Sequence, residues 1–190
     1  MHNRLWPTLL TPILISACAT APGPSPAPAP DALRPLMTAI GQRIDIANDV
    51  ALSKWYSGKP VQDSNRERQV IINAESQAQA YSLTRDEVRQ FMTAQMEANK
   101  VVQYARIAQW HKRGRVPQQP ASTLTGTIRT RLDTLQPVLM EKYAAFVPYR
   151  THSACVSWVQ AEIKRQTADP VIVAAMQRAT ADLCIAASNP

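Results

Sequence analysis

The apolar residues between positions 33 and 55 recur every three or four positions, which is the period of an α-helix with one buried face. The positions that carry this pattern are Leu36, Met37, Ile40, Ile44, Ala47, Val50 and Ala51. Gly58 and Pro60 follow directly, and both residue types commonly end a helix. The pattern therefore predicts one long helix from about Leu33 to Trp55.

Two further helices are predicted from the start signals that precede their apolar positions. Ser64 and Glu67 have the spacing of a capping box, in which a hydroxyl and a carboxylate accept hydrogen bonds from free backbone N–H groups. The helix that this box opens carries Val70, Ile71, Ala74, Ala78 and Tyr81. Thr84 and Glu87 repeat the spacing and open a long helix that continues to Gly114.

The C-terminal part of the chain also has helical periodicity. After a proline-containing loop over residues 115–121, helical patterns cover residues 125–146, 153–166 and about 170–187. Pro137 is expected to kink or divide the first of these helices, because proline lacks the backbone N–H that an inner turn needs. Asp169 and Pro170 supply an N-cap and a first-turn proline for the last helix, which we expect to end near Ala187. Since no segment alternates convincingly, we predict an all-α bundle of about six helices.

The first thirty residues have the composition of an export segment. A short basic start precedes a mostly apolar stretch over residues 5–16, which is too short to span a bilayer as a mature helix. Two processing routes fit its end, since residues 15–18 resemble a bacterial lipobox with Cys18 as the lipidated residue, whereas residues 17–21 also fit ordinary signal peptidase. We therefore expect a signal peptide over residues 1–17 and a Pro/Ala-rich linker over residues 18–30.

The remainder is expected to form one domain, with core helices over residues 31–115 and a C-terminal helical region over residues 116–190. Cys155 and Cys184 remain once Cys18 is assigned to processing, and an oxidising compartment would let them form a disulfide. Two buried free thiols are the alternative for a reduced protein. The three histidines are scattered and no Cys-x-x-Cys occurs, so we predict no metal site.

The formal net charge of +7 permits an anionic partner without identifying it. The basic residues 111–115 (His-Lys-Arg-Gly-Arg) would suit a nucleic acid. These residues end a predicted helix, however, where cations interact favourably with the helix dipole. We therefore predict no nucleic-acid partner.

Polar residues occur on helix faces that should meet a neighbouring helix. Arg43 and Lys54 are three helical turns apart on the edge of one apolar stripe, and a buried cation is costly unless an anion accompanies it. A second stripe on the long third helix contains Gln95, Asn99, Gln103 and Arg106. Each residue alone would be unremarkable, but two such stripes in one chain indicate a polar cavity for an anionic ligand.

These residues and their spacing resemble the all-helical, or AroQ-class, chorismate mutases over roughly residues 33–110. The matching positions are Arg43, Lys54-Trp55, Pro60-Val61-Gln62-Asp63, Arg66-Glu67 and Gln95-x-x-x-Asn99-x-x-x-Gln103. The export signal, the extra C-terminal helices and the cysteine pair are similar to the secreted (gamma) subclass. The resemblance implies the type II chorismate mutase fold, no cofactor, and a homodimer in which each site lies within one chain.

The resemblance also implies a reaction and residue roles. Chorismate carries two carboxylates and rearranges to prephenate through a chair-like transition state in which negative charge gathers on the breaking ether oxygen. By this resemblance the carboxylates are held by Arg43, Arg66 and Arg129, with Arg131 as a rival of Arg129. The ether oxygen accepts from Lys54 and Gln103. Asn99 bonds a carboxylate or a neighbouring group, and Asp63 or Glu67 meets the substrate hydroxyl.

Two positions differ from some relatives. A glutamate that replaces Gln103 in some relatives must be protonated to donate, whereas a glutamine donates at any pH. Asn99 stands where some relatives have Ser or Thr. The alternative function is a non-catalytic helical envelope lipoprotein that binds an anionic ligand, and such a protein would not depend on Lys54 more than on Lys59.

Overall fold

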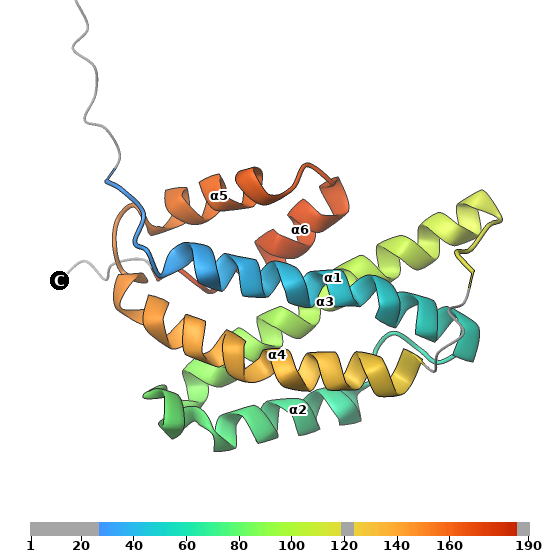
Figure 1. The fold of residues 1–190 in the computed structure, drawn as a ribbon, viewed down its shortest axis with the longest axis horizontal. Helices are drawn as coiled ribbons and strands as arrows, with labels where there is room; N and C mark the ends of the chain where they lie inside the picture. Colours follow the sequence, from blue (N-terminus) through green and yellow to red (C-terminus); the bar gives the residue numbers. More distant parts are fainter. Residues whose placement is uncertain (1–26, 119–123, 186–190) are drawn as a thin grey trace, which may run out of the picture.

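The computed structural model describes residues 27–118 and 124–185, and all of its regular elements are helical (Figure 1). The six α-helices are α1 (Leu33–Ser57), α2 (Ser64–Ser76), α3 (Arg85–Arg113), α4 (Leu124–Phe146), α5 (Cys155–Gln166) and α6 (Pro170–Ala179). Short 3-10 turns cover Ala78–Tyr81 and Val147–Tyr149. The predicted all-α bundle of six helices is confirmed. The expected signal peptide and Cys18 lie outside the described residues.

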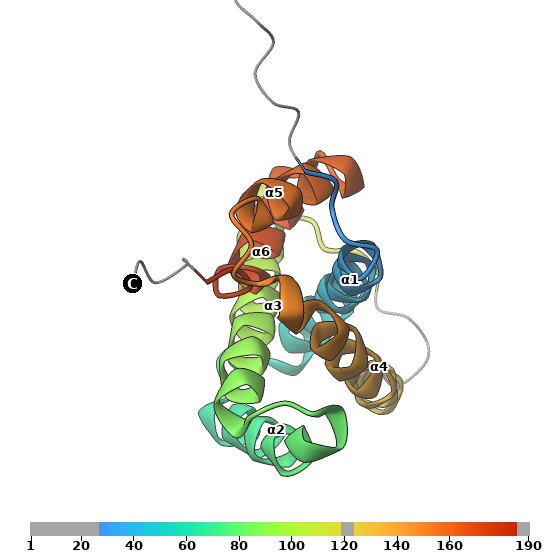
Figure 2. The same ribbon diagram turned by 90° about the vertical axis from the view of Figure 1, so that its left-hand side faces the viewer.

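Helix α1 is the central element of the bundle. It packs along α3 and α4, while α6 and α2 each pack along α3 (Figures 1 and 2). The predicted apolar face of α1 is buried, and Leu36, Met37 and Ile40 have no exposed surface. Across the core the rings of Phe91 and Tyr143 stack with centroids 4.2 Å apart. None of the helices in the described ranges is long and apolar enough to cross a membrane.

The helix ends agree with the sequence prediction at α1 and α3. Gly58 ends α1 with φ of 65°, and Gly114 ends α3 with φ of 60°; a side chain at either position would strain this left-handed backbone. The capping box at the start of α3 is present, since Thr84 Oγ1 accepts from the Glu87 N–H and Glu87 accepts from the Thr84 N–H.

The predicted capping box at the start of α2 is wrong by one residue. The N-cap is Asp63, whose Oδ1 accepts from the Arg66 N–H over 3.1 Å. Glu67 Oε1 in turn accepts from the Asp63 N–H over 3.2 Å. Asp is as good an N-cap as Ser, so the extra residue before Ser64 takes the capping role. The shift matters because it orients two carboxylates that the sequence assigns to a ligand site.

The structure contradicts the division that was one of the two outcomes expected at Pro137, and it contradicts the expected end of the last helix. Helix α4 continues through Pro137 without division, because a proline removes only its own backbone hydrogen bond and the neighbouring turns persist. Helix α6 begins after the Asp169 cap as predicted but ends at Ala179 instead of near Ala187. The chain beyond it turns back, so that the Ile185 N–H donates to the Arg150 carbonyl over 2.9 Å.

This turn brings Cys155 and Cys184 together. Cys155 and Cys184 form a disulfide with their Cα atoms 5.8 Å apart, which confirms the predicted bond. The buried Arg150 stabilises the same turn, because its guanidinium donates to the carbonyl oxygens of Leu183 and Asp182 over 2.9 and 2.7 Å. The start of α5 and the segment after α6 are therefore joined, which closes the α5–α6 hairpin at the end opposite its connecting loop.

Candidate active site

A cavity of about 310 Å³ lies between α1, the start of α2, the middle of α3 and the first half of α4. The eight substrate-binding residues expected from the sequence all line this cavity: Arg43, Lys54, Asp63, Arg66, Glu67, Asn99, Gln103 and Arg129. The strap between α1 and α2 closes one side of it through Lys59 and Val61. Four segments that are far apart in the sequence thus contribute to a single cavity.

A larger hollow of about 600 Å³ lies between the start of α1 and α5. It is lined by Arg34, Gln42 and Glu162 among others, and by none of the residues expected at the site. Its buried carboxylate, Glu162, already pairs with Arg165. The cavity between α1, α3 and α4 is therefore the better candidate, because its cations are less fully neutralised.

Arg43 is the most deeply buried cation of the cavity, with 6% of its surface exposed. Burial lowers its pKa to about 10, so the guanidinium is still charged at neutral pH. Its Nε has no hydrogen-bond partner among the described residues. A buried cation without a carboxylate is costly, and an anionic ligand in the cavity would relieve that cost.

Two amides connect α3 to α1 at the cavity wall. Asn99 Nδ2 donates to the Arg43 carbonyl over 3.2 Å, and Gln103 Nε2 donates to Asn99 Oδ1 over 2.7 Å. Both side chains are buried, and Gln103 Oε1 has no partner in the described part of the chain. Because an amide nitrogen carries two hydrogens, Gln103 keeps a second N–H for a ligand in the cavity.

Two of the three carboxylates that line the cavity, Asp63 and Glu67, are already engaged by protein donors. Asp63 caps α2, and Glu67 accepts from the Asp63 N–H through Oε1 and from Lys100 Nζ through Oε2, the latter over 3.2 Å. Lys100 also pairs with Glu97 over 2.7 Å. Sequence reasoning did not single out Lys100, although its position beside Asn99 on the same helix could have indicated it. The lining keeps more cations than carboxylates and suits a compact anion.

The structure separates the two arginines between which the sequence left the choice open. Arg129 lines the cavity, whereas Arg131 pairs with Asp49 of α1 and is not among the lining residues. Two residues along a helix point to nearly opposite sides, so only one of the two can face the cavity.

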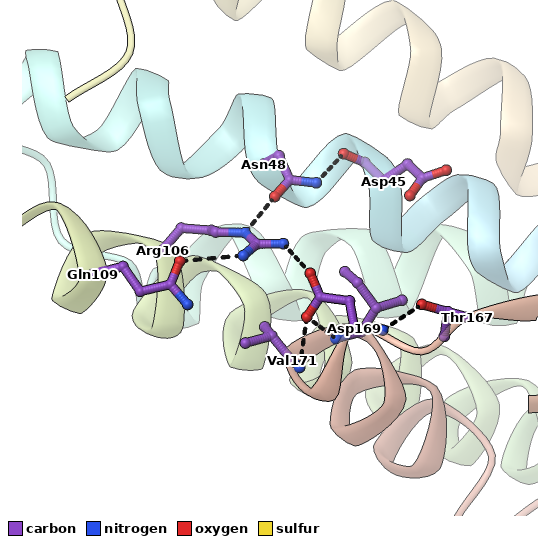
Figure 3. Close-up of polar contacts among 8 residues, drawn as sticks. Asp45, Asn48, Arg106, Gln109, Thr167, Asp169 and Val171 are labelled. Carbon is purple, nitrogen blue, oxygen red and sulfur yellow. Dashed lines mark hydrogen bonds and ion pairs between the residues drawn. The ribbon is translucent and has the colours of Figure 1, made fainter. Parts of the chain in front are cut away.

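The polar stripe on α3 is not a single site. Asn99 and Gln103 line the cavity, but Gln95 donates to the Ala179 carbonyl of α6 over 3.0 Å. Arg106 instead contacts Asn48 and Asp169 (Figure 3). The interpretation of the four residues as one ligand-facing stripe is therefore wrong at both ends, because α3 is also covered by α6.

No cluster of three or more His, Cys, Asp or Glu side chains that could hold a metal occurs in residues 27–118 and 124–185. The polar groups that face the cavity are guanidinium, ammonium and amide donors beside a few carboxylates. Such a set can hold carboxylates and donate hydrogen bonds to an oxygen that gains negative charge.

Comparison with known proteins agrees with this arrangement. The family model "Chorismate mutase type II" matches residues 34–104. The secreted chorismate mutase of Mycolicibacterium smegmatis is 29% identical over 156 residues, which cover 80% of this chain and 86% of the relative. That of Yersinia pestis is 29% identical over 105 residues, or 55% of each chain. The names of these relatives support a location outside the cytoplasm.

Solved structures extend the match to most of the chain. The structure of a chorismate mutase from Burkholderia phymatum has a TM-score of 0.77 and 38% identity, covering 82% of this chain and 97% of the other. One from Burkholderia thailandensis has a TM-score of 0.76 and 29% identity, covering 82% of this chain and 100% of the other. With the fold, the cavity and these matches in agreement, the chain belongs to the type II chorismate mutase family.

Proposed function

We propose that the chain catalyses the rearrangement of chorismate to prephenate without a cofactor, through electrostatic stabilisation in the cavity between α1, α2, α3 and α4. The observation that carries the proposal is the cavity itself, in which the Nε of the buried Arg43 has no partner among the described residues and the Gln103 amide nitrogen has a second hydrogen left to donate. These two N–H donors fit a ligand that is anionic and also accepts hydrogen bonds.

The reaction needs little covalent chemistry from the protein. Within one molecule a C–O bond breaks and a C–C bond forms, and no proton or electron leaves the substrate. The protein must hold the dianion in its compact conformer, which removes the entropic cost of reaching the transition state. It must also stabilise the negative charge that gathers on the ether oxygen.

Residue roles follow from the positions of the charges. Arg43, Arg66 and Arg129 are proposed to hold the two carboxylates, since a planar guanidinium binds a carboxylate through two parallel hydrogen bonds. The free donor of Asn99 can reach a carboxylate or a neighbouring group. Support for Arg43 comes from its burial and its unpartnered Nε.

Lys54 and Gln103 are proposed to donate to the ether oxygen from opposite walls, one on α1 and the other on α3. For the substrate hydroxyl we favour Glu67 over Asp63. Both Glu67 oxygens are oriented by protein donors, and each keeps a lone pair to accept another hydrogen bond. Asp63 is more exposed than Glu67, and only one of its oxygens is held by a protein donor.

We further propose that residues 31–115 and 116–190 act as one domain. Arg129 of α4 contributes to the wall of a cavity that the earlier helices also line, and α6 packs along α3. Both contacts support a single domain. The expected export signal over residues 1–17, with the linker over residues 18–30, would place the activity in the periplasm or outside the cell. The intact mass of the exported protein would distinguish a lipidated Cys18 from an unmodified cleaved end.

A homodimer with a complete site in each chain is likewise proposed. One chain supplies all eight expected substrate-binding residues, which supports a complete site in each chain, whereas the dimer itself rests on the resemblance to the secreted subclass. Light scattering of the purified protein measures the oligomeric state directly.

The reaction itself is tested by following the loss of the diene absorbance of chorismate with the purified, disulfide-intact protein in the presence of a chelator. We expect metal-independent turnover and stoichiometric prephenate. A folded protein that does not turn chorismate over would contradict the proposal and favour an anion-binding envelope protein.

A further inference from the structure

Arg106 links α3 to α1 and to the start of α6 through residues that do not line the cavity. Its Nε donates to Asn48 Oδ1 of α1 over 2.9 Å, and a second guanidinium nitrogen donates to Asp169 Oδ2, the N-cap of α6, over 3.0 Å (Figure 3). The third nitrogen donates to Gln109 Oε1 of its own helix over 3.2 Å. All three guanidinium nitrogens therefore have partners, and none of the proposed roles of the site uses this residue.

The partners of Arg106 are themselves held in place. Asn48 Nδ2 donates to the Asp45 carbonyl over 3.2 Å, which turns its oxygen toward Arg106. Asp169 Oδ1 accepts from the N–H groups of Val171 and Ile172 at the start of α6. The hydrogen bonds from Arg106 and Val171 lower the pKa of Asp169, so the carboxylate is ionised across the physiological range. The guanidinium is thus bound to two oriented oxygens.

The position of this contact relative to the cavity is informative. Asn48 lies between Arg43 and Lys54 on α1, and Arg106 follows Gln103 by one turn of α3. Two side-chain hydrogen bonds join α3 to α1 in the described ranges, one from Asn99 to the Arg43 carbonyl and one from Arg106 to Asn48. The first fixes the Arg43 end of α1. Of these two hydrogen bonds between α3 and α1, the second is the nearer to Lys54; elsewhere on α1, Asp49 pairs with Arg131 and Tyr56 donates to the Pro117 carbonyl.

The other contacts between α1 and α3 restrain axial displacement of one helix along the other less strongly. Ile44, Ala47 and Val102 are apolar and buried at this interface, and apolar contacts have little directional preference. Beyond Lys54 the ring of Trp55 meets Trp110 edge to face with centroids 5.9 Å apart, an aromatic contact that tolerates small shifts. Hydrogen bonds to an oriented amide, in contrast, fix the axial position of one helix on the other.

We propose that Arg106 is a positioning residue: through Asn48 it fixes α1 on α3, and so sets the placement of Lys54 relative to Gln103. The inference rests on the proposed function of these two donors. Asp169 contributes by holding the guanidinium against the start of α6, whose positive dipole end would otherwise repel it. The disulfide-closed α5–α6 hairpin thereby supports the catalytic helices from behind.

The expected kinetic signature follows from the roles of the two ends of α1. The carboxylate contacts near Arg43 keep their own tie through Asn99, so KM should change little. Lys54 and Gln103 act on charge that develops in the transition state, and a displacement of about 1 Å can cost about 10²-fold in rate. Loss of the Arg106–Asn48 contact should therefore lower kcat and leave KM nearly unchanged.

The test uses a matched set of variants of the full chain. Asn48→Ala removes the α1 partner and leaves the ion pair with Asp169, whereas Asn48→Asp keeps an oxygen acceptor for Arg106. Arg106→Met removes all three contacts. Arg165→Met is the control, because the exposed Arg165 lies on α5 away from the cavity, and Glu162 keeps the hydrogen bond from Gln166 when this ion pair is removed.

We expect Asn48→Ala and Arg106→Met to lower kcat about tenfold or more, with KM within about threefold of the original. Asn48→Asp should retain most of kcat, and Arg165→Met should match the original protein. The inference is overturned if folded Asn48→Ala keeps full kcat, if Asn48→Asp is as impaired as Asn48→Ala, or if kcat and KM move together.

Amide hydrogen exchange provides a readout that needs no turnover. Asn48→Ala should speed exchange in the C-terminal half of α1, and Arg165→Met should not. Inactivity of the unaltered protein would defeat the proposed function but leave this measurement interpretable. Unchanged exchange in Asn48→Ala would show that the contact does not hold α1, and would defeat the positioning role by itself.

Discussion

The side-chain amide of Gln103 donates a hydrogen bond to Oδ1 of Asn99 over 2.7 Å, and Asn99 in turn donates to the Arg43 carbonyl. These two consecutive hydrogen bonds fix which end of the Gln103 amide is the donor. If the amide were turned over, two oxygens would face each other. Gln103 is therefore held with its N–H₂ group oriented by α3 and α1 together, as a donor to the ether oxygen requires.

This orientation predicts a change in pH dependence for Gln103→Glu. The original protein should keep a nearly constant kcat/KM between about pH 5 and pH 7 as far as this group is concerned, since an amide does not titrate. An ionised glutamate would face Asn99 Oδ1 without a proton to donate, so kcat/KM of the variant should fall about tenfold per pH unit above the pKa of its carboxyl. Rates of both proteins across this range check the prediction, and a variant with a flat profile would contradict it.

The separation of Arg129 from Arg131 predicts unequal effects of their removal. Arg129→Ala should raise KM about 10- to 100-fold, because a charge-assisted hydrogen bond contributes about 1.5–3 kcal/mol. Arg131→Ala removes an ion pair with Asp49 in which both side chains are more than a third exposed, and such pairs contribute little. Steady-state kinetics of the two variants decide the matter. Equal effects on KM, or a larger effect of Arg131→Ala, would contradict the assignment of the carboxylate contact to Arg129.

The disulfide is predicted to stabilise the fold without acting in the reaction. Cys155 and Cys184 are 29 residues apart, and a closed loop of this size is worth about 3–4 kcal/mol in the chain-entropy account. Replacing both cysteines with serine should lower the melting temperature while kcat/KM at room temperature stays within about twofold, because neither residue lines the cavity. Calorimetry and kinetics on the same sample provide the test. A folded variant with greatly reduced kcat/KM would show that the hairpin does more than stabilise.

The capping box of α3 predicts part of the loss of stability in acid. Hydrogen bonding from the Thr84 N–H, with smaller contributions from the Thr84 hydroxyl and Arg150, lowers the pKa of Glu87. A carboxylate whose pKa is lower in the folded state stabilises fully above its unfolded pKa of about 4.3, and this contribution is lost as the pH falls through the folded value. The original protein should have a larger free energy of unfolding than Glu87→Gln above about pH 5, and this difference should decrease as the pH falls to about 3. Denaturant unfolding measures it, and a constant difference would contradict the assignment.

Local signals were sufficient for most of the helices. The apolar period of residues 33–55 and the Thr84–Glu87 box correspond directly to α1 and α3, because each depends on residues within a few turns. The end of α6 could not be found in this way. Nothing near Ala179 stops a helix; the chain turns there because Cys184 must reach Cys155 and residues 182–185 bind Arg150, which are long-range contacts.

The candidate site was predictable to the extent that it follows helix spacing. Arg43 and Lys54 share a face of α1, and Asn99 and Gln103 share a face of α3, so periodicity brings each pair to one side. The same periodicity also grouped Gln95 and Arg106 with the site, since one sequence cannot show which neighbouring helix covers each part of a face. The packing of α6 along α3 removes these two residues from the cavity.

The central claim is that Lys54 acts on the substrate, and the alternative is that it only stabilises the end of α1. Lys54 lies in the last turn of that helix, where a cation is stabilised by the helix dipole by about 0.3–1 kcal/mol. The free energy of unfolding of Lys54→Ala should therefore be nearly that of the original protein. Lys59→Ala, on the exposed strap of the same cavity, and Lys112→Ala, in the last turn of α3, are matched controls.

The most direct measurement is the rate of chorismate loss for these three variants beside the original protein. We predict that Lys54→Ala lowers kcat by about 10²–10³-fold or more at nearly unchanged stability. Lys59→Ala should have a much smaller effect, and Lys112→Ala should match the original. A Lys54→Ala variant that is folded and turns chorismate over at the original rate would contradict the account.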